Sequence, residues 1–188
     1  TTNMVETLFC AKDKLEDSVI VSYGDIIYQK DVLQKLINSK DDISVVIDKK
    51  WKKYWEIRTT QPLNDVESLV LENGFIQNIG QKVSSLDEIE GQYIGLMKFQ
   101  NEGLEFLKTF YHSAKNESHL GNIMNPDIPF EKSYMTDLLQ GLINSGCKLK
   151  AVLIENGWLE LDNYHDYEVY NKKFKDKTIF EFFSLNQL

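Results

Sequence analysis

The sequence predicts an α/β fold, and two observations carry the prediction. The first is a strand–helix–strand order, because short apolar runs at residues 18–23 and 43–48 flank an amphipathic helix at residues 31–38. The β-branched content of both runs is typical of strands buried in a parallel sheet, and the three pieces together form a βαβ unit. The second is length, since 188 residues can bury most of their apolar surface in one core. We therefore expect a single domain over residues 1–188.

Further elements follow from the spacing of apolar residues. Helical spacing is found at residues 5–15, 103–112, 134–143, 163–175 and 178–185. Runs typical of strands are found at residues 67–71, 75–79, 93–99 and 150–155. The first two of these strands are joined by Asn73-Gly74, a pair that tolerates positive φ at both positions and so predicts a hairpin. The apolar segment 179–183 suits a homodimer interface as well as a core, so both stay open.

Composition argues against several classes of protein. The chain has 21 Lys and Arg against 29 Asp and Glu, a formal charge of −8, which argues against a nucleic-acid-binding surface. No apolar stretch approaches the ~20 residues that a membrane span needs. Cys10 and Cys147 lie too far apart in sequence to indicate a disulfide framework or a metal pair, which fits a reducing cytoplasm. We expect a cytoplasmic protein that binds neither nucleic acid nor membrane.

The first candidate site is the end of the strand at residues 18–23. In open α/β sheets, ligands bind beyond the carboxyl ends of the strands, and Gly24-Asp25 follows this strand directly. Glycine lets the backbone approach a ligand, and a carboxylate is a natural ligand for Mg²⁺, which usually takes one or two protein carboxylates plus phosphate oxygens. Asp25 is equally well explained as a cap of the next helix, because Asp is a common capping residue.

A second candidate is the acidic segment 158–163. Glu160 and Asp162 alternate with Leu159 and Leu161, so on a strand both carboxylates would share one face. Any half-exposed strand shows the same alternation, and taken alone the pattern favours that explanation.

Three weaker candidates lie elsewhere. Lys82 follows the predicted hairpin, and residues 90–95 place two glycines at the start of a strand, where backbone can approach a ligand. Simple turn chemistry explains both equally well. The segment 51–58 interleaves aromatic residues with lysines and Arg58, which suits either anion binding or an amphipathic surface helix whose lysines snorkel to solvent.

The order of these segments resembles the sugar-phosphate and choline-phosphate nucleotidyltransferases. Residues 2–8 resemble the family's Asn-x-x-x-Ser/Thr-Leu segment, and residues 21–27 resemble its Gly-Asp strand end. Residues 90–95 are similar to its Glu-Gly-Glu-x-x-Gly segment. Residues 157–162 resemble its Trp-x-Glu-Ile-Asp segment, and Asp166 matches a later Asp. Each motif alone is weak, but four in the family's order cover nearly the whole chain.

Within that superfamily the chain looks most like the cytidylyltransferases that act on phosphonates, phosphocholine or a phosphorylated amino acid such as phosphoglutamine. The subgroup likeness lies in residues 46–51 and 55–58, followed by Pro62, Asp65 and Glu67. The resemblance implies a Rossmann-like three-layer fold with a mixed, mostly parallel sheet. It also implies a Mg²⁺-dependent enzyme that joins CTP and a phosphorylated or phosphonylated small molecule to a CDP-linked or CMP-linked product, with release of pyrophosphate. Such products serve the decoration of capsules, other surface polysaccharides or lipids.

The resemblance also assigns roles to residues. It implies that Asp25 and Asp162 bind Mg²⁺ and that Lys82 contacts the acceptor phosphate, so these three are the expected catalytic residues. The expected substrate-binding residues are Asn3, Gly24, Arg58, Glu90, Gly95, Trp158 and Glu160.

One family feature has no match in the sequence, the Gly-x-Gly-x-Arg nucleotide loop that follows the family's first strand. The resemblance therefore implies a fold lacking its N-terminal strands, with about sixty to eighty residues ahead of Thr1. Whether this polypeptide alone catalyses stays open. The alternatives are a sugar-1-phosphate nucleotidyltransferase that uses another NTP, a glycosyltransferase of related topology, and a non-catalytic domain. A plain α/β domain, in which the acids are only caps, is the fourth.

Overall fold

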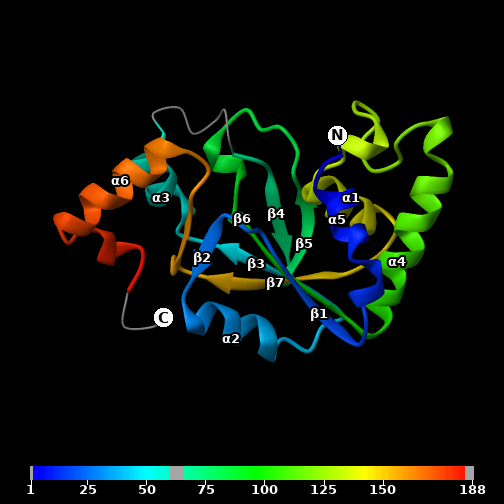
Figure 1. Ribbon diagram of the computed structural model, residues 1–188, viewed down its shortest axis with the longest axis horizontal. Coiled ribbons are helices and arrows are strands. Elements are labelled where there is room, and N and C mark those ends of the chain that lie inside the picture. Colours follow the sequence, from blue (N-terminus) through cyan, green and yellow to red (C-terminus); the bar gives the residue numbers. More distant parts are fainter. Residues whose placement is uncertain (1, 60–65, 185–188) are drawn as a thin grey trace.

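A computed structural model describes residues 2–59 and 66–184. They form a six-stranded sheet and a separate two-stranded sheet, flanked by helices (Figure 1). The large sheet has the order β1-β6-β3-β7-β5-β4. Its strands are β1 (Ser18–Ser22), β3 (Ile43–Asp48), β4 (Leu69–Glu72), β5 (Phe75–Ile79), β6 (Gln92–Gln100) and β7 (Leu149–Ile154). The small sheet pairs β2 (Ile26–Tyr28) with β8 (Trp158–Glu160) in antiparallel register. The α/β class is confirmed.

The directions of the strands correct one expectation. Among the described strands of the large sheet, β3 and β7 form the only parallel pair, and the other neighbours are antiparallel. The prediction of a mostly parallel sheet is therefore wrong. β1 and β3 do run in the same direction, but β6 lies between them and is antiparallel to both. A buried strand has a continuous apolar run whichever way its neighbours run, so the local sequence carries no sign of this inserted strand.

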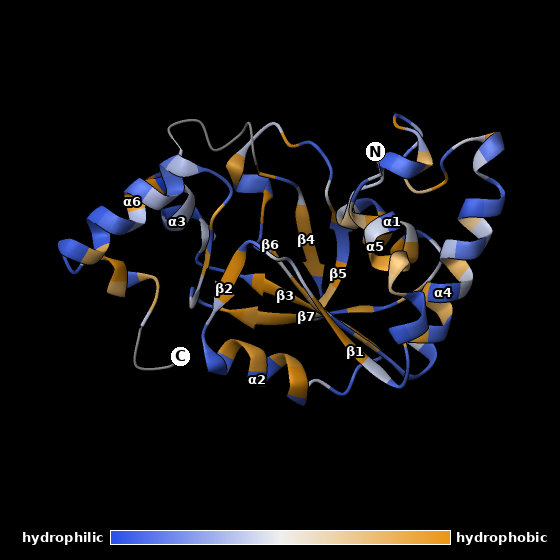
Figure 2. Ribbon diagram, in the orientation of Figure 1, coloured by the Kyte–Doolittle hydropathy of each residue, from blue (hydrophilic) through white to orange (hydrophobic). Residues whose placement is uncertain are grey.

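β1 also departs from the expectation of a buried strand. It lies at an edge of the described sheet, and its side chains alternate between exposed and half-buried, with Ile20 40% exposed. β3 is the strand that fits the expectation, because all six of its residues are buried. Figure 2 shows apolar colour along β3 and β7 and mostly polar colour over α4 and α6.

Helices cover both faces of the sheet, which confirms the three-layer arrangement. Helix α2 (Lys30–Asn38) lies on one face, where Ser39 at its end meets Ser44 of β3 through their hydroxyl oxygens at 2.8 Å. Helix α4 (Asn101–Asn116) lies on the other face, and Gly103 approaches Ile43 so closely that a Cβ there would lie 2.7 Å from the isoleucine side chain. Ser44 and Ile43 are neighbours on a strand and point to opposite faces.

The remaining helices complete the two ends of the molecule. On the side of α4 lie α1 (Met4–Cys10) and α5 (Met135–Asn144), and α5 is buried along most of its length. At the other end α3 (Trp51–Arg58) packs on α6 (Tyr164–Lys175), as Figure 1 shows. No helix within the described ranges is long and apolar enough to cross a bilayer.

Local signals account for several boundaries. Asn73 and Gly74 have φ of 52° and 79°, so the predicted hairpin between β4 and β5 is confirmed. The helix expected at residues 178–185 is shorter in the described residues, where one 3₁₀ turn at Ile179–Glu181 precedes Phe182 and Phe183. Those two aromatic residues are buried against the domain. Their packing fits the core alternative for these two residues, and a homodimer stays a prediction.

Candidate active site

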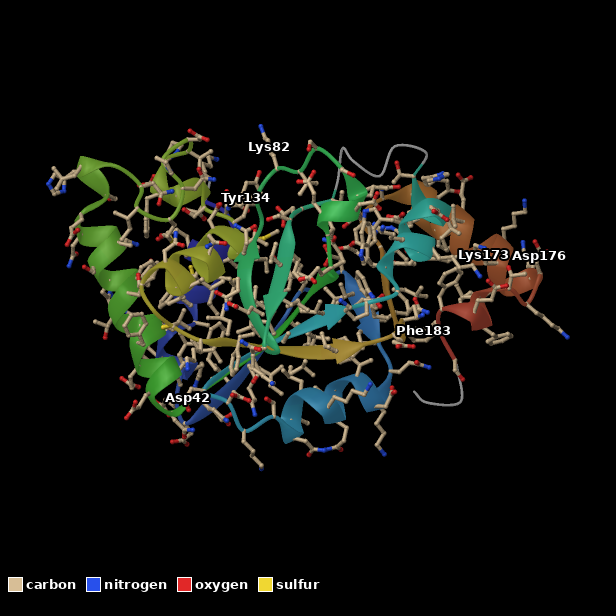
Figure 3. The ribbon with its side chains drawn as sticks, turned by 180° about the vertical axis from the view of Figure 1, so that it is seen from behind. Asp42, Lys82, Tyr134, Lys173, Asp176 and Phe183 are labelled. Atoms are coloured by element: carbon tan, nitrogen blue, oxygen red, sulfur yellow. The ribbon has the colours of Figure 1, made fainter. Side chains whose placement is uncertain are left out.

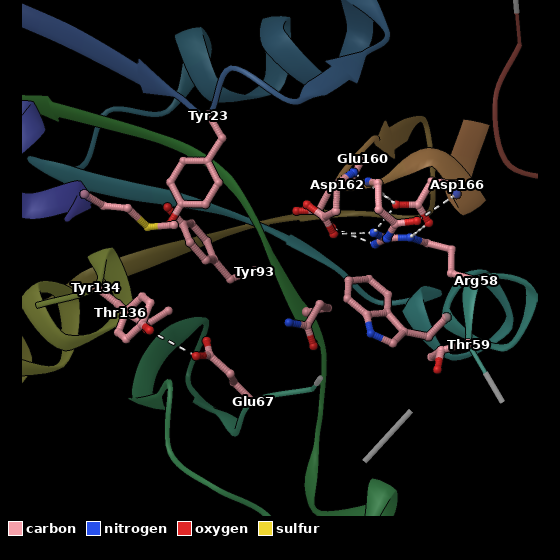
Figure 4. A pocket seen from close by; sticks show the side chains of 14 residues that line it. Tyr23, Arg58, Thr59, Glu67, Tyr93, Tyr134, Thr136, Glu160, Asp162 and Asp166 are labelled. Carbon is pink, nitrogen blue, oxygen red and sulfur yellow. Dashed lines mark hydrogen bonds and ion pairs between the residues drawn. The ribbon is translucent and has the colours of Figure 1, made fainter. Parts of the chain in front are cut away.

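A pocket of about 660 Å³, called the main pocket below, opens at the edge of the sheet where β1 and β3 end and β6 begins. Its volume is typical of small-molecule sites. Figure 4 shows Tyr23, Tyr93 and Glu67 on one side and Arg58 with its acidic partners on the other. The walls are aromatic and acidic. This is the edge at which open α/β sheets bind ligands.

Arg58 is the centre of the acidic wall. Its side chain is 5% exposed and its guanidinium binds three carboxylates. Nη1 donates to Glu160 at 2.6 Å, Nη2 donates to Asp162 at 2.5 Å, and Nε donates to Asp166 at 3.0 Å. The planar guanidinium has five N–H donors in a fixed fork, so it can bind three carboxylates in set directions. The predicted shared face of Glu160 and Asp162 is confirmed, because both reach the same guanidinium.

Asp166 joins this cluster to helix α6. One carboxylate oxygen accepts the backbone N–H of Asp162 at 3.0 Å and of Asn163 at 3.3 Å, in a capping box with the Asn163 side chain. The residue is 1% exposed, so both its charge and the helix end are satisfied away from water. Of the residues matched to the family, Asp166 therefore has a structural role that connects the helix to Arg58.

Two tyrosines hold the end of β8 in place. The Tyr54 hydroxyl lies 2.6 Å from that of Tyr170 and accepts the backbone N–H of Glu160 at 2.7 Å. Tyr170 in turn donates to the Glu160 carbonyl at 2.6 Å. Burial raises the pKa of both tyrosines, so they stay neutral. The Glu160 backbone is fixed on both sides.

Burial raises the pKa of Glu160 to about 7, and the charges of Asp162 and Asp25 act in the same direction while Arg58 opposes them. The carboxyl therefore takes up a proton within the neutral range. Titration of this group changes the charge of the main pocket between weakly acidic and neutral conditions.

Tyr23 and Gly95 form the opposite wall. Tyr23 meets Tyr93 edge to face with ring centroids 5.7 Å apart, and its hydroxyl lies 3.1 Å from the Met4 sulfur. Gly95 has φ of 79°, and a Cβ there would lie 2.5 Å from the Tyr23 ring. Gly95 makes room for the ring that lines the pocket, and its predicted substrate contact stays a prediction.

A second hollow of about 450 Å³, called the side pocket, adjoins the first. It shares Met4 and Tyr23 with the main pocket and is lined also by Asn3, Gly24 and Asp25. Six of the predicted site residues thus line two neighbouring hollows, with Arg58, Glu160 and Asp162 in the main pocket and Asn3, Gly24 and Asp25 in the side pocket. Asn3 holds its segment by donating to the Lys132 carbonyl at 2.9 Å.

The backbones of Asp25 and Asp162 lie close together in space, although the two residues are far apart in sequence. The small sheet continues past β2 and β8, so that the Leu161 N–H donates to the Asp25 carbonyl at 2.8 Å. Asp25 is exposed, and Asp162 gives one carboxylate oxygen to Arg58. Within the described residues no three His, Cys, Asp or Glu side chains converge as a metal site. A pair of carboxylates does fit Mg²⁺, which takes one or two from the protein and the rest from phosphates and water.

Other predicted residues lie outside the main pocket. Trp158 is 1% exposed and its indole N–H donates to the buried Asp48 carboxylate at 2.9 Å, so it holds β8 to β3. Glu90 accepts the Leu71 N–H along the edge of β4 at 2.5 Å. Lys82 is exposed after β5 and points outward in Figure 3. The predicted substrate contacts of Trp158, Glu90 and Lys82 stay predictions.

Two residues of the main pocket were not singled out from the sequence. Trp55 and Gln92 are 4% and 7% exposed, and both line the pocket. The Trp55 Nε1 and the Gln92 Oε1 have no hydrogen-bond partner in the described part of the chain. Leaving a buried polar atom unpaired costs about 1–3 kcal/mol, so such atoms are uncommon in folded proteins. No pattern in the sequence marks Trp55 or Gln92 as a site residue, beyond their positions in segments 51–58 and 90–95.

Comparison with known proteins agrees with this geometry. The chain is 42% identical over 178 residues to a CTP:phosphoglutamine cytidylyltransferase of Campylobacter jejuni, a match that covers 92% of this chain and 68% of the relative. The chain belongs to this cytidylyltransferase family. The predicted likeness to nucleotidyltransferases, and to the phosphoglutamine type among them, is confirmed. No family model matches the chain.

Solved structures show the same fold. An inositol-1-phosphate CTP transferase from T. maritima matches with a TM-score of 0.64 at 17% identity, covering 91% of this cytidylyltransferase-family chain and 62% of that structure. A nucleoside-diphosphate-sugar pyrophosphorylase from Vibrio cholerae matches with a TM-score of 0.56 at 13% identity, covering 92% and 66%. The chain thus spans about two thirds of the length of the proteins that it matches.

Proposed function

We propose that the protein transfers a cytidylyl group from CTP to a phosphorylated or phosphonylated small molecule. The observation that carries the proposal is the 42% identity to a CTP:phosphoglutamine cytidylyltransferase across nearly the whole chain. A pocket of suitable size at the edge of the sheet supports it. By analogy with the relative, a phosphorylated amino acid is the first acceptor to test.

In the proposed reaction a phosphate oxygen of the acceptor attacks the α-phosphorus of CTP. A P–O bond to the acceptor forms, the bond from the α-phosphorus to the bridging oxygen breaks, and pyrophosphate leaves with that electron pair. Transfers of this kind depend on positioning and on charge neutralisation more than on covalent help from the protein. The expected roles of this chain's residues are therefore to bind and orient the two substrates and to neutralise their charge.

Asp25 and Asp162 are the residues we expect to hold Mg²⁺. When bound, the ion would act as a Lewis acid and as a template for the triphosphate. The exposed carboxylate of Asp25 and its backbone contact beside Asp162 support the assignment. Arg58 fixes the orientation of Asp162 and Glu160 from the other side.

The other predicted residues have narrower proposed roles. Asn3 and Glu160 would orient the acceptor, one from each hollow, and Lys82 would contact its phosphate. Lys82 lies on the loop after β5, so its contribution is the least supported by geometry. We also infer a cytoplasmic location and a product used in decorating surface polysaccharide or lipid.

The proposal is tested by measuring pyrophosphate release by the full-length gene product with CTP, UTP, GTP or ATP, each with phosphorylated and phosphonylated acceptors. The expected result is release that needs both CTP and an acceptor and that stops on adding a chelator. Asp25→Asn should abolish it, while Asp17→Asn, an exposed acid outside both hollows, should leave it unchanged. Acceptor-dependent release with another NTP would indicate a different nucleotidyltransferase. No release with any pair would refute the proposal.

A further inference from the structure

Helix α6, at one end of the molecule in Figure 1, carries a row of exposed aromatic residues. Tyr164, Tyr167 and Phe174 are 72%, 49% and 36% exposed. Asn171, also exposed, lies in the same row. Residues spaced by three, four and three fall on one side of a helix, so the four form a continuous strip, called the α6 stripe below. The rings of Tyr164 and Tyr167 pack together, with centroids 5.8 Å apart.

The opposite face of α6 fixes the helix to the domain. Asp166 and Tyr170 lie on that face and are 1% and 4% exposed. Asp166 accepts from Arg58 at 3.0 Å, and Tyr170 donates to the Glu160 carbonyl at 2.6 Å. A capping box with Asn163 closes the first turn. The α6 stripe is therefore presented by a helix that is already ordered, so a partner that binds it has little ordering cost to overcome.

The size of the α6 stripe indicates the strength of the contact that it can make. Its three rings expose roughly 300 Å² per chain, because one tyrosine or phenylalanine can bury about 150–250 Å². A stable protein interface buries about 800 Å² per partner. The rings thus supply about a third of such an interface, from a helix about 18 Å long. Aromatic residues are enriched at interfaces, and this area fits a weak, reversible complex.

The charges beside the α6 stripe indicate which partner covers it. Glu168 flanks the first half of the stripe, and Lys172 and Lys175 flank the second half on the same side. None of these three exposed groups forms an ion pair within residues 2–59 and 66–184. A second α6 helix in antiparallel orientation would place its lysines beside Glu168 of the first, and the reverse. A parallel copy would place lysines beside lysines, which repel.

We propose that the α6 stripe joins two copies of this protein about a twofold axis, with their α6 helices antiparallel. Centring the stripe on the axis places Tyr164 against Phe174 of the partner subunit and Tyr167 against Asn171 of the partner subunit. A twofold axis uses the same patch on both copies, so the assembly closes at two. The polar Asn171 within the aromatic row favours one register, as a single polar residue does in coiled coils. The inference does not depend on the proposed function.

The test is sedimentation velocity of the full-length gene product from ~1 to ~200 μM, the range that suits a weak interface. We expect a reversible equilibrium between monomer and dimer. A protein that stays monomeric over the whole range would overturn the inference. Monomers that pellet with vesicles of anionic phospholipid would identify a lipid surface as the partner of the stripe, and would overturn it too.

Variants assign the dimer to the α6 stripe. The double variant Tyr164→Ala/Tyr167→Ala should raise the dissociation constant at least about tenfold, because tyrosines at the centre of an interface carry much of its binding energy. Leu120→Ala is the matched control and should leave the constant unchanged. Leu120 is 80% exposed and follows α4, which lies at the other end of the molecule from α6 (Figure 1). Equal dissociation constants for the wild type and the double variant would overturn the inference.

Charge reversal tests the antiparallel arrangement. Glu168→Lys would face the lysines of the partner subunit and should weaken the dimer several-fold, and adding Lys172→Glu should restore it. Both effects should fade at high ionic strength. In a parallel dimer residue 168 would lie beside its own copy, so the reversal would replace one repulsion by another. A dissociation constant that Glu168→Lys does not change would therefore overturn the antiparallel arrangement. Circular dichroism melting of dilute, monomeric samples checks that each variant is folded.

Discussion

Arg58→Met removes the cation that holds three carboxylates together at the end of the pocket. Asp166 has a side chain that is 2% exposed, so its charge would be left away from water, whereas Glu160, whose pKa Arg58 holds down to about 7, would take up a proton once Arg58 is gone. Removing one partner from a buried ion cluster typically costs about 3–5 kcal/mol. We expect that loss in the free energy of unfolding at pH 7, a large share of the roughly 5–15 kcal/mol of a typical domain. Urea unfolding followed by tryptophan fluorescence measures it.

The pH dependence of the loss in unfolding free energy distinguishes an unpaired buried charge from a simple loss of packing. As the pH falls, carboxylates that have lost Arg58 as a partner take up protons. The difference in unfolding free energy between the wild type and Arg58→Met should therefore become smaller towards pH 4. Lys52→Met is the matched control on the same helix, because Lys52 pairs at 3.2 Å with Asp87, which is 92% exposed, and such pairs contribute at most about 1 kcal/mol. A loss below about 1 kcal/mol for Arg58→Met, or one that is the same at pH 7 and pH 4, would refute the reasoning.

Three further predictions follow from single contacts. The pKa of Glu160 is raised from 4.5 to about 7, so between these pH values the native state holds a proton that the unfolded state has lost. As the pH rises from 4.5 to 7, the free energy of unfolding of the wild type should therefore fall by up to about 3 kcal/mol more than that of Glu160→Gln. Parallel pH curves for the two proteins in urea would contradict this. Gly95→Ala should lower the melting temperature and raise the acceptor KM by displacing Tyr23, whereas Gly24→Ala, where a Cβ meets nothing within 4 Å, should not change the melting temperature. Trp158→Phe should cost about 1–3 kcal/mol of unfolding free energy by removing a donor to the buried Asp48, and a change under about 0.5 kcal/mol would show that this bond is dispensable.

Local signals predicted most of the elements but not how they assemble. The Asn73-Gly74 turn and the helical spacing of α2 depend on residues near in sequence, and both are confirmed. The position of β6 between β1 and β3 depends on pairing between residues about fifty to eighty apart, which no short pattern records. For that reason the sequence did not predict that most neighbouring strands of the sheet are antiparallel.

The acidic part of the site was predicted better than its role. Alternation placed Glu160 and Asp162 on one face, and the structure adds that Arg58, from a helix a hundred residues earlier, lies between them. An arginine among lysines gave no sign that its partners would be carboxylates rather than a phosphate. Trp55 and Gln92 could not be recognised at all, because an unpaired buried atom is visible only once every neighbour is placed.

The most direct test of the proposed cytidylyl transfer is ³¹P NMR of the reaction mixture with full-length gene product, CTP, Mg²⁺ and a phosphorylated amino acid as acceptor. Transfer at the α-phosphorus predicts pyrophosphate and a new pair of coupled diphosphate resonances, appearing in equal amounts as CTP disappears. Formation of CDP with inorganic phosphate, or of CMP without a coupled diphosphate, would contradict it.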